Sequence, residues 1–345
     1  MTPPSSARLS RRALVRGGLL GAIALGIGTI YQRRDSVRYT PGFARALWRR
    51  LAGETTQVSI ARCPTYADTT AAVRQAWDAI GGPPLAGKRV VLKPNLVDYL
   101  PDRPVHTAPE VLEAAIDYLR QHDVAQIVVA DGPSFNRDSD HLLAESGLGD
   151  RLERIGVPFV DLNYDDLDRV PLEGNYGRLT SLYLPRTITR ADLVISVPKL
   201  KTHHWAGVSL SLKNLFGVVP GVEYGWPKNS LHVNGIPASI LALYATIRPG
   251  LALIDGVVGL EGDGPIYGEA KRTGVLMMGT DLVALDATAT RVMGMAPASV
   301  DHIRAAGELG IGLIDQARIV VAGEPVSRVA QQYAAPPRMP EDQSK

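Results

Sequence analysis

Apolar residues recur along the middle of this chain in short runs that have few polar interruptions. The runs cover residues 88–94, 125–133, 157–163, 191–198, 251–260, 274–281 and 317–323. Continuous Val, Ile and Leu runs are typical of strands covered on both faces, whereas strands with one wet face alternate apolar and polar residues. We therefore expect a buried sheet with helices on both of its faces.

Stretches with helical periodicity lie between these runs. Residues 107–123, TAPEVLEAAIDYLRQHD, form an amphipathic pattern with Thr107 as a candidate N-cap and Glu110 three residues later. Another helix is expected over about residues 282–293, with Asp281 and Asp286 stabilising its start. Strands that alternate with helices predict an α/β fold with a mainly parallel sheet.

The expected folded part spans residues 56–325, either as one α/β domain or as two α/β lobes over 56–189 and 190–325. The polar segment 36–55 has no clear period and is predicted to be a linker. The Pro-rich, polar end of the chain, residues 326–345, is predicted to be a flexible tail.

The first 35 residues have a different character from the rest. Ser10, Arg11 and Arg12 precede a glycine-rich apolar run, which resembles a twin-arginine export signal. Its uncharged part, Gly17 to Gln32, has 16 residues, fewer than the ~20 that a spanning helix needs. Residues 1–35 are therefore expected to be a twin-arginine-type signal or, alternatively, an N-terminal anchor. Either would place the protein in the periplasm or another extracytoplasmic space, with or without a membrane tether.

Charge and cysteine content exclude several classes of protein. The net charge is +2, so no strong overall field attracts nucleic acid, and membrane contact is expected only through the N-terminal segment. Cys63 is the single cysteine, which excludes an intrachain disulfide, a Cys-rich zinc site and an iron–sulfur cluster built by this chain alone. The sequence contains neither the glycine fingerprint of dinucleotide-binding folds nor a P-loop.

Polar residues follow several predicted strands, at the ends where open α/β sheets bind ligands. Lysines there can hold a phosphate or a carboxylate as point charges, so the pattern favours a small anionic ligand. The residues expected to bind it are Lys93, Asn95, Asp131, Lys201, Asn214 and Asp255. Glu261 and Asp263 lie in a glycine-dense stretch and would hold a divalent cation or a ribose hydroxyl, or pair with the lysines. A tight acidic turn is the alternative for these two residues.

Residues 199–214, KLKTHHWAGVSLSLKN, gather cations and imidazoles directly after a predicted strand. Lys199 is expected to solvate a loop. Lys213 lies in a segment too apolar for a surface helix, so it is either partly buried with a partner or extends to the surface. A desolvated lysine has a lowered pKa and serves as base or nucleophile, so Lys213 is a candidate catalytic residue.

His203, His204 and His232 lie within 30 residues of one another. Side chains alternate along an extended segment, so one of the adjacent pair should face the site, and the spacing to Lys213 favours His203. His203 is predicted to transfer protons with Lys213 or to hydrogen-bond an anionic ligand. A metal site formed by His203 and His232 is the alternative.

Four blocks of this sequence resemble the signature blocks of the domain of unknown function 362 family, over about residues 56–325. The blocks are VLKPNLV, ADLVISVPKLKTHHWAGVSLSLKNLFGVVPG, LALIDGVVGLEGDGP and GTDLVALDATATRVMG. The family is largely uncharacterised, so the resemblance implies little about function. Some of its members carry ferredoxin-like cysteine clusters, which this chain lacks.

The second block is also similar, more distantly, to a central stretch of the lactate racemase (nickel-pincer nucleotide) family. His203, Ser209 and Lys213 fall at matching offsets, as do Ala206-Gly207 and Pro220-Gly221. This resemblance implies a nickel or nucleotide-like cofactor held by Lys213, proton transfer by His203 and nickel binding by His232. Two departures are plain: the loop DGPSFN lacks the family's second catalytic histidine, and Leu210-Ser211-Leu212 replaces glycines before the lysine. The resemblance therefore implies a shared scaffold and site position more than shared chemistry.

Three functions stay open at this point. The first is an exported enzyme that acts on a small carboxylate or phosphate-bearing substrate by proton transfer through His203 and Lys213. The second is a module that binds a cofactor or a metal cluster and works with a redox partner. The third is a non-catalytic binding protein tethered to the outer face of a membrane.

Overall fold

The computed structural model describes residues 48–49, 51–133, 137–174, 176–225 and 229–336. The predicted signal or anchor over residues 1–35 lies outside this part, as does most of the predicted linker 36–55. Among the described residues, no helix has both the length and the apolar character needed to cross a membrane.

A ten-stranded sheet runs through the middle of the molecule in the order β12-β1-β11-β10-β7-β2-β3-β4, with β8 paired to β10 and β9 paired to β8. Its strands are β1 (Thr56–Arg62), β2 (Arg89–Lys93), β3 (Gln126–Asp131), β4 (Phe159–Asp161), β7 (Leu193–Ser196), β8 (Lys199–His203), β9 (Gly207–Ser209), β10 (Leu251–Glu261), β11 (Glu269–Gly279) and β12 (Ile319–Gly323). Antiparallel pairing is confined to β11 with its two neighbours and to β8 with β9; all other pairs in this sheet are parallel. The predicted mainly parallel sheet is confirmed.

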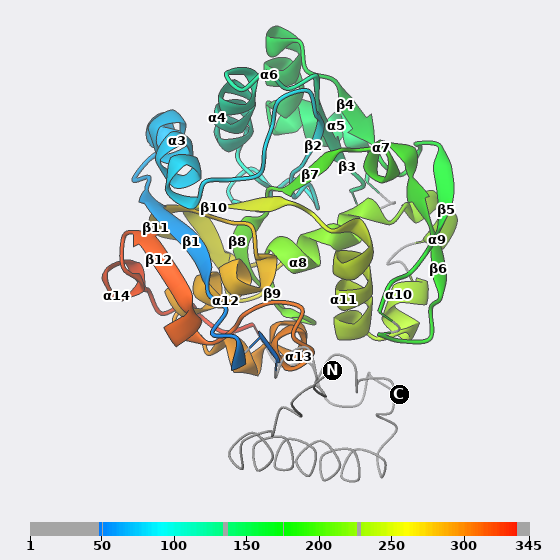
Figure 1. Ribbon diagram of the computed structural model, residues 1–345. Coiled ribbons are helices and arrows are strands. Elements are labelled where there is room, and N and C mark those ends of the chain that lie inside the picture. The colour runs from blue at the N-terminus through cyan, green and yellow to red at the C-terminus, as the bar shows by residue number, and fades with distance from the viewer. Residues whose placement is uncertain (1–47, 50, 134–136, 175, 226–228, 337–345) are drawn as a thin grey trace, which may run out of the picture.

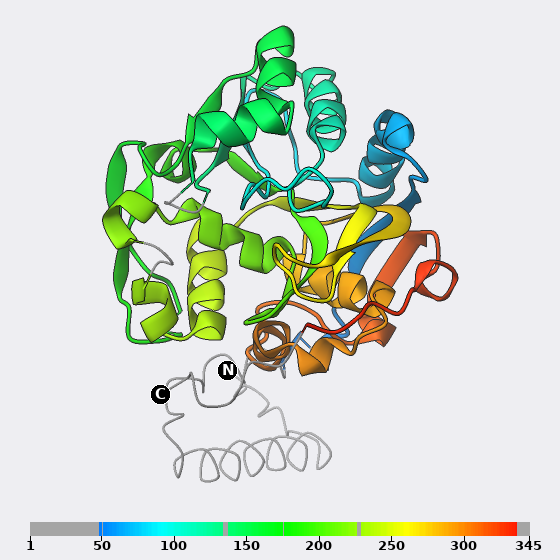
Figure 2. The same ribbon diagram turned by 180° about the vertical axis from the view of Figure 1, so that it is seen from behind.

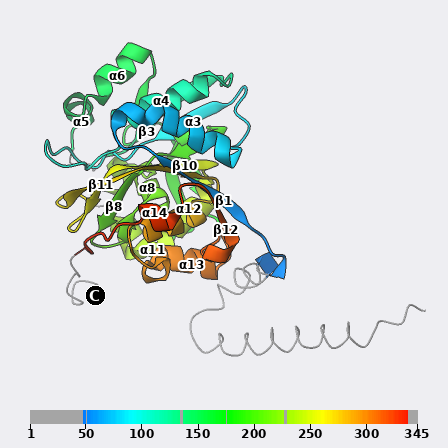
Figure 3. The same ribbon diagram turned by 90° about the vertical axis from the view of Figure 1, so that its left-hand side faces the viewer.

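Helices cover both faces of this sheet, as the continuous apolar runs predicted. In β2, Val90 and Leu92 point into one hydrophobic core while Val91 points into the other, because side chains alternate along a strand. The first core is closed by α3 (Thr69–Ile80), α4 (Pro109–Arg120) and α6 (Leu148–Ile155). The second is closed by α11 (Ile236–Ile247), α12 (Leu282–Val292) and α13 (Asp301–Glu308). The two helical layers lie above and below the sheet in Figure 3.

The shorter elements surround this three-layer core. A separate two-stranded sheet, β5 (Leu167–Pro171) with β6 (Ser181–Pro185), stands at one side of the molecule (Figures 1 and 2). The Tyr224 hydroxyl accepts a hydrogen bond of 2.7 Å from the backbone nitrogen of Tyr183, which ties β6 to α9. The other short helices are α5 (Ser139–Glu145), α7 (Arg186–Thr189), α8 (Ser211–Asn214), α9 (Gly221–Tyr224), α10 (Asn229–Val233) and α14 (Val326–Val329).

The sheet does not divide near residue 189, where a boundary between two lobes was one expectation. β1 pairs with β11 and β12, which come more than 200 residues later in the chain, and β2 pairs with β7. Strands from both halves of the sequence therefore interleave in one sheet.

Residues 326–336, expected to begin a flexible tail, instead pack against the sheet. Tyr333 is fully buried, and its hydroxyl lies 2.6 Å from the hydroxyl of Thr273 in β11. The backbone nitrogen of Ala334 donates to the Glu261 carboxylate at 2.8 Å. One buried aromatic side chain thus fixes a segment whose overall composition is that of a tail.

Candidate functional site

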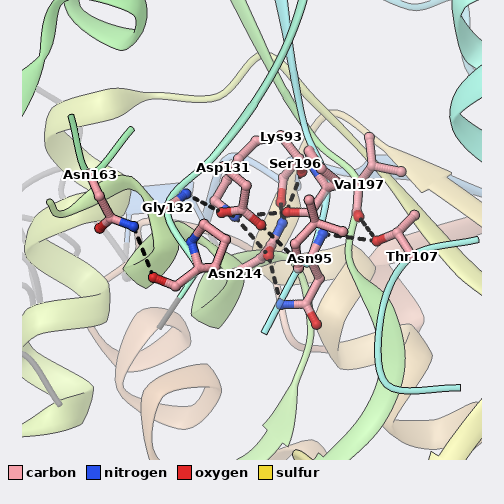
Figure 4. Close-up of polar contacts among 12 residues, drawn as sticks. Lys93, Asn95, Thr107, Asp131, Gly132, Asn163, Ser196, Val197 and Asn214 are labelled. Atoms are coloured by element: carbon pink, nitrogen blue, oxygen red, sulfur yellow. Dashed lines mark hydrogen bonds and ion pairs between the residues drawn. The ribbon is translucent and has the colours of Figure 1, made fainter. Parts of the chain in front are cut away.

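Polar side chains meet at the carboxyl ends of three neighbouring parallel strands. Lys93 is the last residue of β2, Asp131 the last of β3 and Ser196 the last of β7. Because these strands are parallel neighbours, their ends lie at one edge of the sheet. Asn214 reaches the same place from α8, and all four side chains are buried (Figure 4).

The centre of this group is an ion pair between Lys93 and Asp131. Lys93 Nζ lies 2.5 Å from Asp131 Oδ1 and also donates to the carbonyl of Pro94 at 2.8 Å. The second carboxylate oxygen accepts a 2.7 Å hydrogen bond from the backbone nitrogen of Leu96. Burial lowers the pKa of Lys93, and the attraction of Asp131 opposes that shift. A side chain on Gly217 would collide with the pair, since its Cβ would lie 2.5 Å from Asp131 Oδ1.

Amide side chains extend this group toward the next loop. Asn214 Nδ2 donates to the carbonyl of Lys93 at 3.1 Å and to Ser196 Oγ at 3.0 Å. Asn95 Nδ2 donates to Asn214 Oδ1 at 3.1 Å, and the Thr107 hydroxyl accepts from the Asn95 backbone nitrogen at 2.9 Å. Asn95 Oδ1 is buried and has no hydrogen-bond partner among the described residues. A buried acceptor of this kind can take a hydrogen bond from a bound molecule.

A second buried ion pair joins Lys199 and Asp255. Lys199 Nζ lies 2.8 Å from Asp255 Oδ2 and 2.7 Å from the Tyr66 hydroxyl, and both charged side chains are fully buried. The expectation that Lys199 solvates a loop is therefore wrong. KLKTH is not a loop but strand β8, which pairs with β10. Asp255, expected to bind a ligand, has both carboxylate oxygens engaged by protein groups.

Lys201 and Lys213 complete the set of enclosed lysines, and neither has a carboxylate within ion-pair distance in the described part of the chain. Lys201 is fully buried, and Nζ donates to the carbonyls of Val105 at 2.7 Å and Pro265 at 3.2 Å. Burial lowers the pKa of Lys201 strongly, and repulsion by Lys213 lowers it further. Two amines therefore share this region without a carboxylate partner among the described residues.

Of the four lysines, Lys213 has the fewest polar partners for its Nζ. It is partly exposed, and its Nζ lies 4.1 Å from the centre of the Phe216 ring. No described residue accepts a hydrogen bond from Nζ. Burial, with a smaller contribution from the charge of Lys93, lowers the pKa of Lys213 to about 7. At neutral pH this amine is divided between its charged and neutral forms.

The short helix α8, which carries Lys213, is held by a buried carboxylate. Asp286 accepts hydrogen bonds from the hydroxyl and the backbone nitrogen of Ser211, at 2.5 and 2.9 Å, and from the backbone nitrogen of Leu212 at 2.9 Å. Burial raises the pKa of Asp286 to about 7, against the effect of these hydrogen bonds. Asp281 caps α12 as predicted, but Asp286 reaches across to α8 and does not stabilise the first turn of its own helix.

Two buried histidines face the same region. His203 Nδ1 accepts hydrogen bonds from the backbone nitrogens of Trp205 at 3.1 Å and Ala206 at 3.3 Å, so the proton of the neutral ring lies on Nε2. Burial and then the charge of Lys213 hold the pKa of His203 well below its usual range. His302 in α13 is fully buried, its Nε2 has no partner among the described residues, and burial with Lys213 lowers its pKa to about 3.

The sequence offered a signal for some of these residues and not for others. Ser196 could have been found, because it lies near the carboxyl end of the predicted strand 191–198. His302 shares the apolar side of α13 with Ile303 and Ala306, a pattern that indicates burial but gives no hint of Lys213 as a neighbour. The hydrogen bond between Asp286 and Ser211 of α8 joins residues 75 positions apart, so no local sequence pattern predicts it.

Several predicted site residues lie elsewhere or remain alone. Glu261 pairs with Lys271 at 3.2 Å, and Asp263 is exposed beside His204, so neither joins the lysine cluster. The ring of His232 packs edge-on against Trp205 at 5.1 Å between centroids. Within the part of the chain that the structure describes, no three His, Cys, Asp or Glu side chains gather around a common point. The described residues therefore add no third protein ligand to His203 and His232.

Comparisons with known proteins place the chain in a family. The model of the family described as Domain of unknown function (DUF362) matches residues 90–291, more than half of the chain. The chain belongs to this family. The match covers the residues of both ion pairs, Lys213 and Asp286, and ends before His302.

Similar proteins are known by sequence and by structure. The Thylakoid-associated protein sll1697 of Synechocystis sp. is 29% identical over 266 residues, which cover 74% of this chain and 79% of that protein. The lactate racemase apoprotein of Thermoanaerobacterium thermosaccharolyticum superimposes with a TM-score of 0.46 and 14% identity, over 70% of this chain and 57% of the racemase. A protein of Thermotoga maritima gives a TM-score of 0.41 and 12% identity, over 73% of this chain and 60% of that one. This DUF362 chain thus matches less than two thirds of either solved structure.

Proposed function

We propose that this DUF362 protein binds a small anion, a carboxylate or a phosphate-bearing molecule, beside Lys213, and transfers a proton to or from it. The observation that carries the proposal is the presence of two enclosed lysines without carboxylate partners. An enclosed amine without a charged partner tends to lose its proton, and a bound anion would stabilise the charged forms of both Lys201 and Lys213. The unpartnered Asn95 Oδ1 supports a ligand that also carries a hydrogen-bond donor.

The two candidate catalytic residues suit different tasks. A general base acts best when its pKa lies near the working pH, which is the case for Lys213. His203 already carries its proton on Nε2 while its Nδ1 faces two backbone N–H groups, so it is placed to donate a hydrogen bond. In this proposal Lys213 is the base, and neutral His203 stabilises the negative charge that develops on the ligand.

The test is ligand binding and proton exchange on the full chain. Isothermal titration calorimetry with inorganic phosphate and with lactate should show binding, and Lys213→Ala should weaken it about tenfold to a hundredfold. Affinity should fall above pH 7, as Lys213 loses its charge. NMR in deuterated water should show exchange of the lactate proton next to the carboxylate.

Lys88→Ala is the matched control, because it removes the same charge at the opposite end of β2 from Lys93. Equal losses of affinity in Lys88→Ala and Lys213→Ala would contradict the proposal, as would failure of both anions to bind. Anion binding without any proton exchange would leave a binding protein and refute the catalytic part.

We also propose that the protein is exported by the twin-arginine route and stays associated with a membrane. The support is the Ser10, Arg11, Arg12 pattern ahead of an apolar run, together with the printed name of the thylakoid-associated relative. Replacing both arginines by lysine should trap the protein in the cytoplasm, as measured by cell fractionation. Unchanged fractionation would refute this route.

A further inference from the structure

The four lysines of the cluster, Lys93, Lys199, Lys201 and Lys213, differ in the hydrogen-bond and ion-pair partners of their Nζ atoms. Lys93 and Lys199 are held in ion pairs, at 2.5 and 2.8 Å, and Lys201 donates to two carbonyl groups. These three side chains are also fully buried. Lys213 alone among them is partly exposed and has no hydrogen-bond acceptor in the described part of the chain. Lys213 is therefore the one lysine of the cluster whose nitrogen has no described protein acceptor and whose residue keeps exposed surface.

The surroundings of Lys213 favour a neutral amine, which is the nucleophilic form. Burial and the charge of Lys93 oppose protonation of Nζ, and the Phe216 ring, 4.1 Å away, offsets only part of this effect by stabilising the ammonium form. His203 adds a neutral ring whose Nε2–H can donate a hydrogen bond. Burial lowers the pKa of both His203 and His302, so these two rings are neutral and leave the charge around Nζ unchanged. Nothing described near the nitrogen competes for its lone pair.

We propose that Lys213 forms an imine with an aldehyde or ketone group of the bound anion, so that the site takes small carbonyl compounds that carry a carboxylate or a phosphate. This inference rests on the proposed anion site and names the substrate class of that site. The anionic group is required because the protonated imine keeps a positive charge where no described carboxylate pairs with Lys213.

The reaction needs no further reagent than a proton, and it releases water. The lone pair of Lys213 Nζ attacks the carbonyl carbon, and the carbonyl electron pair moves to oxygen, which His203 Nε2–H can stabilise by a hydrogen bond. A proton passes from nitrogen to that oxygen and gives a carbinolamine. The nitrogen lone pair then forms the C=N bond while the hydroxyl takes a proton from solvent and leaves as water. Amine, carbonyl and one proton thus give a protonated imine and water.

The test is reductive trapping on the full chain. The protein is incubated at pH 7 with cyanoborohydride and one of four probes: pyruvate, glyceraldehyde 3-phosphate, butanone or lactate. Pyruvate and the phosphorylated aldehyde distinguish the two anionic groups, butanone lacks a charge, and lactate lacks the carbonyl. Intact mass and peptide mapping should find one adduct, on Lys213, with at least one of the two charged carbonyl probes and with neither of the others.

The test depends on selective trapping at Lys213 compared with other lysines. At pH 7 about half of the Lys213 amine would be neutral, compared with less than about one in a thousand for a lysine with the ordinary pKa near 10.4. Trapping at Lys213 should therefore level off just above pH 7, whereas trapping at a lysine with the ordinary pKa should keep rising. Lys213→Arg, which retains a positive charge, should bind lactate and form no adduct.

The outcomes separate this inference from the function on which it rests. Binding of lactate or phosphate without a Lys213 adduct from either charged probe would overturn the imine and leave the anion site standing. If neither lactate nor phosphate bound and no Lys213 adduct formed, the anion site and the imine would both be overturned. An adduct on Lys213 no more abundant than on Lys88, or equal trapping of butanone, would also overturn the inference.

Discussion

At the scale of single residues, the contact between Lys213 and Phe216 decides how much of the amine is neutral. A cation over an aromatic face gains about 0.5–2 kcal/mol, which is worth about 0.4–1.5 pKa units. Phe216→Leu keeps the apolar volume but removes this attraction, so the pKa of Lys213 should fall further below 7. The pH dependence of Lys213 modification by a trace of acetic anhydride, followed by mass spectrometry, measures this shift.

The same experiment contains its own reference. The profile of Lys88, which has no contact with Phe216, should be identical in the two proteins. A Lys213 profile that does not move, or that moves to higher pH, would mean that the ring does not stabilise the ammonium form.

The buried pair of Lys93 and Asp131 makes a second prediction at this scale. Asp131→Asn would leave the Lys93 charge buried without its partner, which typically costs about 3–5 kcal/mol of unfolding free energy. Urea denaturation measures this loss. The double change Lys93→Met with Asp131→Leu should recover much of it, because a packed apolar pair needs no desolvation of charge.

Asp192→Asn is the comparison for this variant. Asp192 pairs with Arg89 at 3.0 Å, but both side chains are largely exposed, so the loss should be small. If Asp131→Asn were no more destabilising than Asp192→Asn, the burial of the Lys93–Asp131 pair would not have the energetic weight given to it here.

At the scale of elements, Asp286 links α12 to α8 and gives a pH-dependent stability. Its folded pKa is about 7, above the value near 3.9 of an unfolded aspartate. The folded state therefore binds more protons between these values, and the stabilising contribution, complete below about pH 4, is lost as pH rises through 7. Asp286→Asn should remove this slope and cost about 1–3 kcal/mol at pH 4, because an amide cannot accept all three hydrogen bonds.

Urea unfolding at several pH values tests this expectation. The difference in unfolding free energy between wild type and Asp286→Asn should shrink from pH 4 to pH 7. Asp150→Asn, at an exposed position in α6, should leave the pH dependence of the wild type unchanged. A constant difference across this range would contradict a raised pKa for Asp286.

The helices and strands also show how much of the fold and of the site could be predicted from the sequence. Apolar continuity predicted seven strands of the large sheet, and it missed β1, β8 and β9. The rule that ligands bind at strand ends grouped Lys93 with Asp131 from the sequence alone. KLKTH was misread as a loop because charged residues at alternate positions normally indicate a solvated edge, whereas β8 buries every one of its residues. The missing information was the partner of each lysine: Asp255 and the carbonyl of Val105 lie 56 and 96 positions away. Pairings of that length follow from the assembled sheet and not from local pattern.

At the scale of the whole molecule, one sheet joins both halves of the chain. The last strand, β12, pairs with the first, β1, and the neighbour of β2 on one side is β7 from the second half. Both hydrophobic cores contain strand residues from the two halves. Neither half can bury its apolar strand faces without the other, so the described fold should behave as a single cooperative unit.

Cooperative unfolding is therefore the expected outcome for the full chain. Far-ultraviolet circular dichroism and tryptophan fluorescence should give coincident urea transitions, since Trp77 of α3 is buried in one hydrophobic core and reports on its packing. A fragment of residues 56–189 contains β1 and β2 without β11, β12 and β7, so its amide NMR spectrum should show the narrow dispersion of an unfolded chain. Fragment 190–325 should behave in the same way, because it lacks β1 and β2. Two separate transitions in the full chain, or a well-dispersed spectrum from either fragment, would show that the halves fold independently despite the shared sheet.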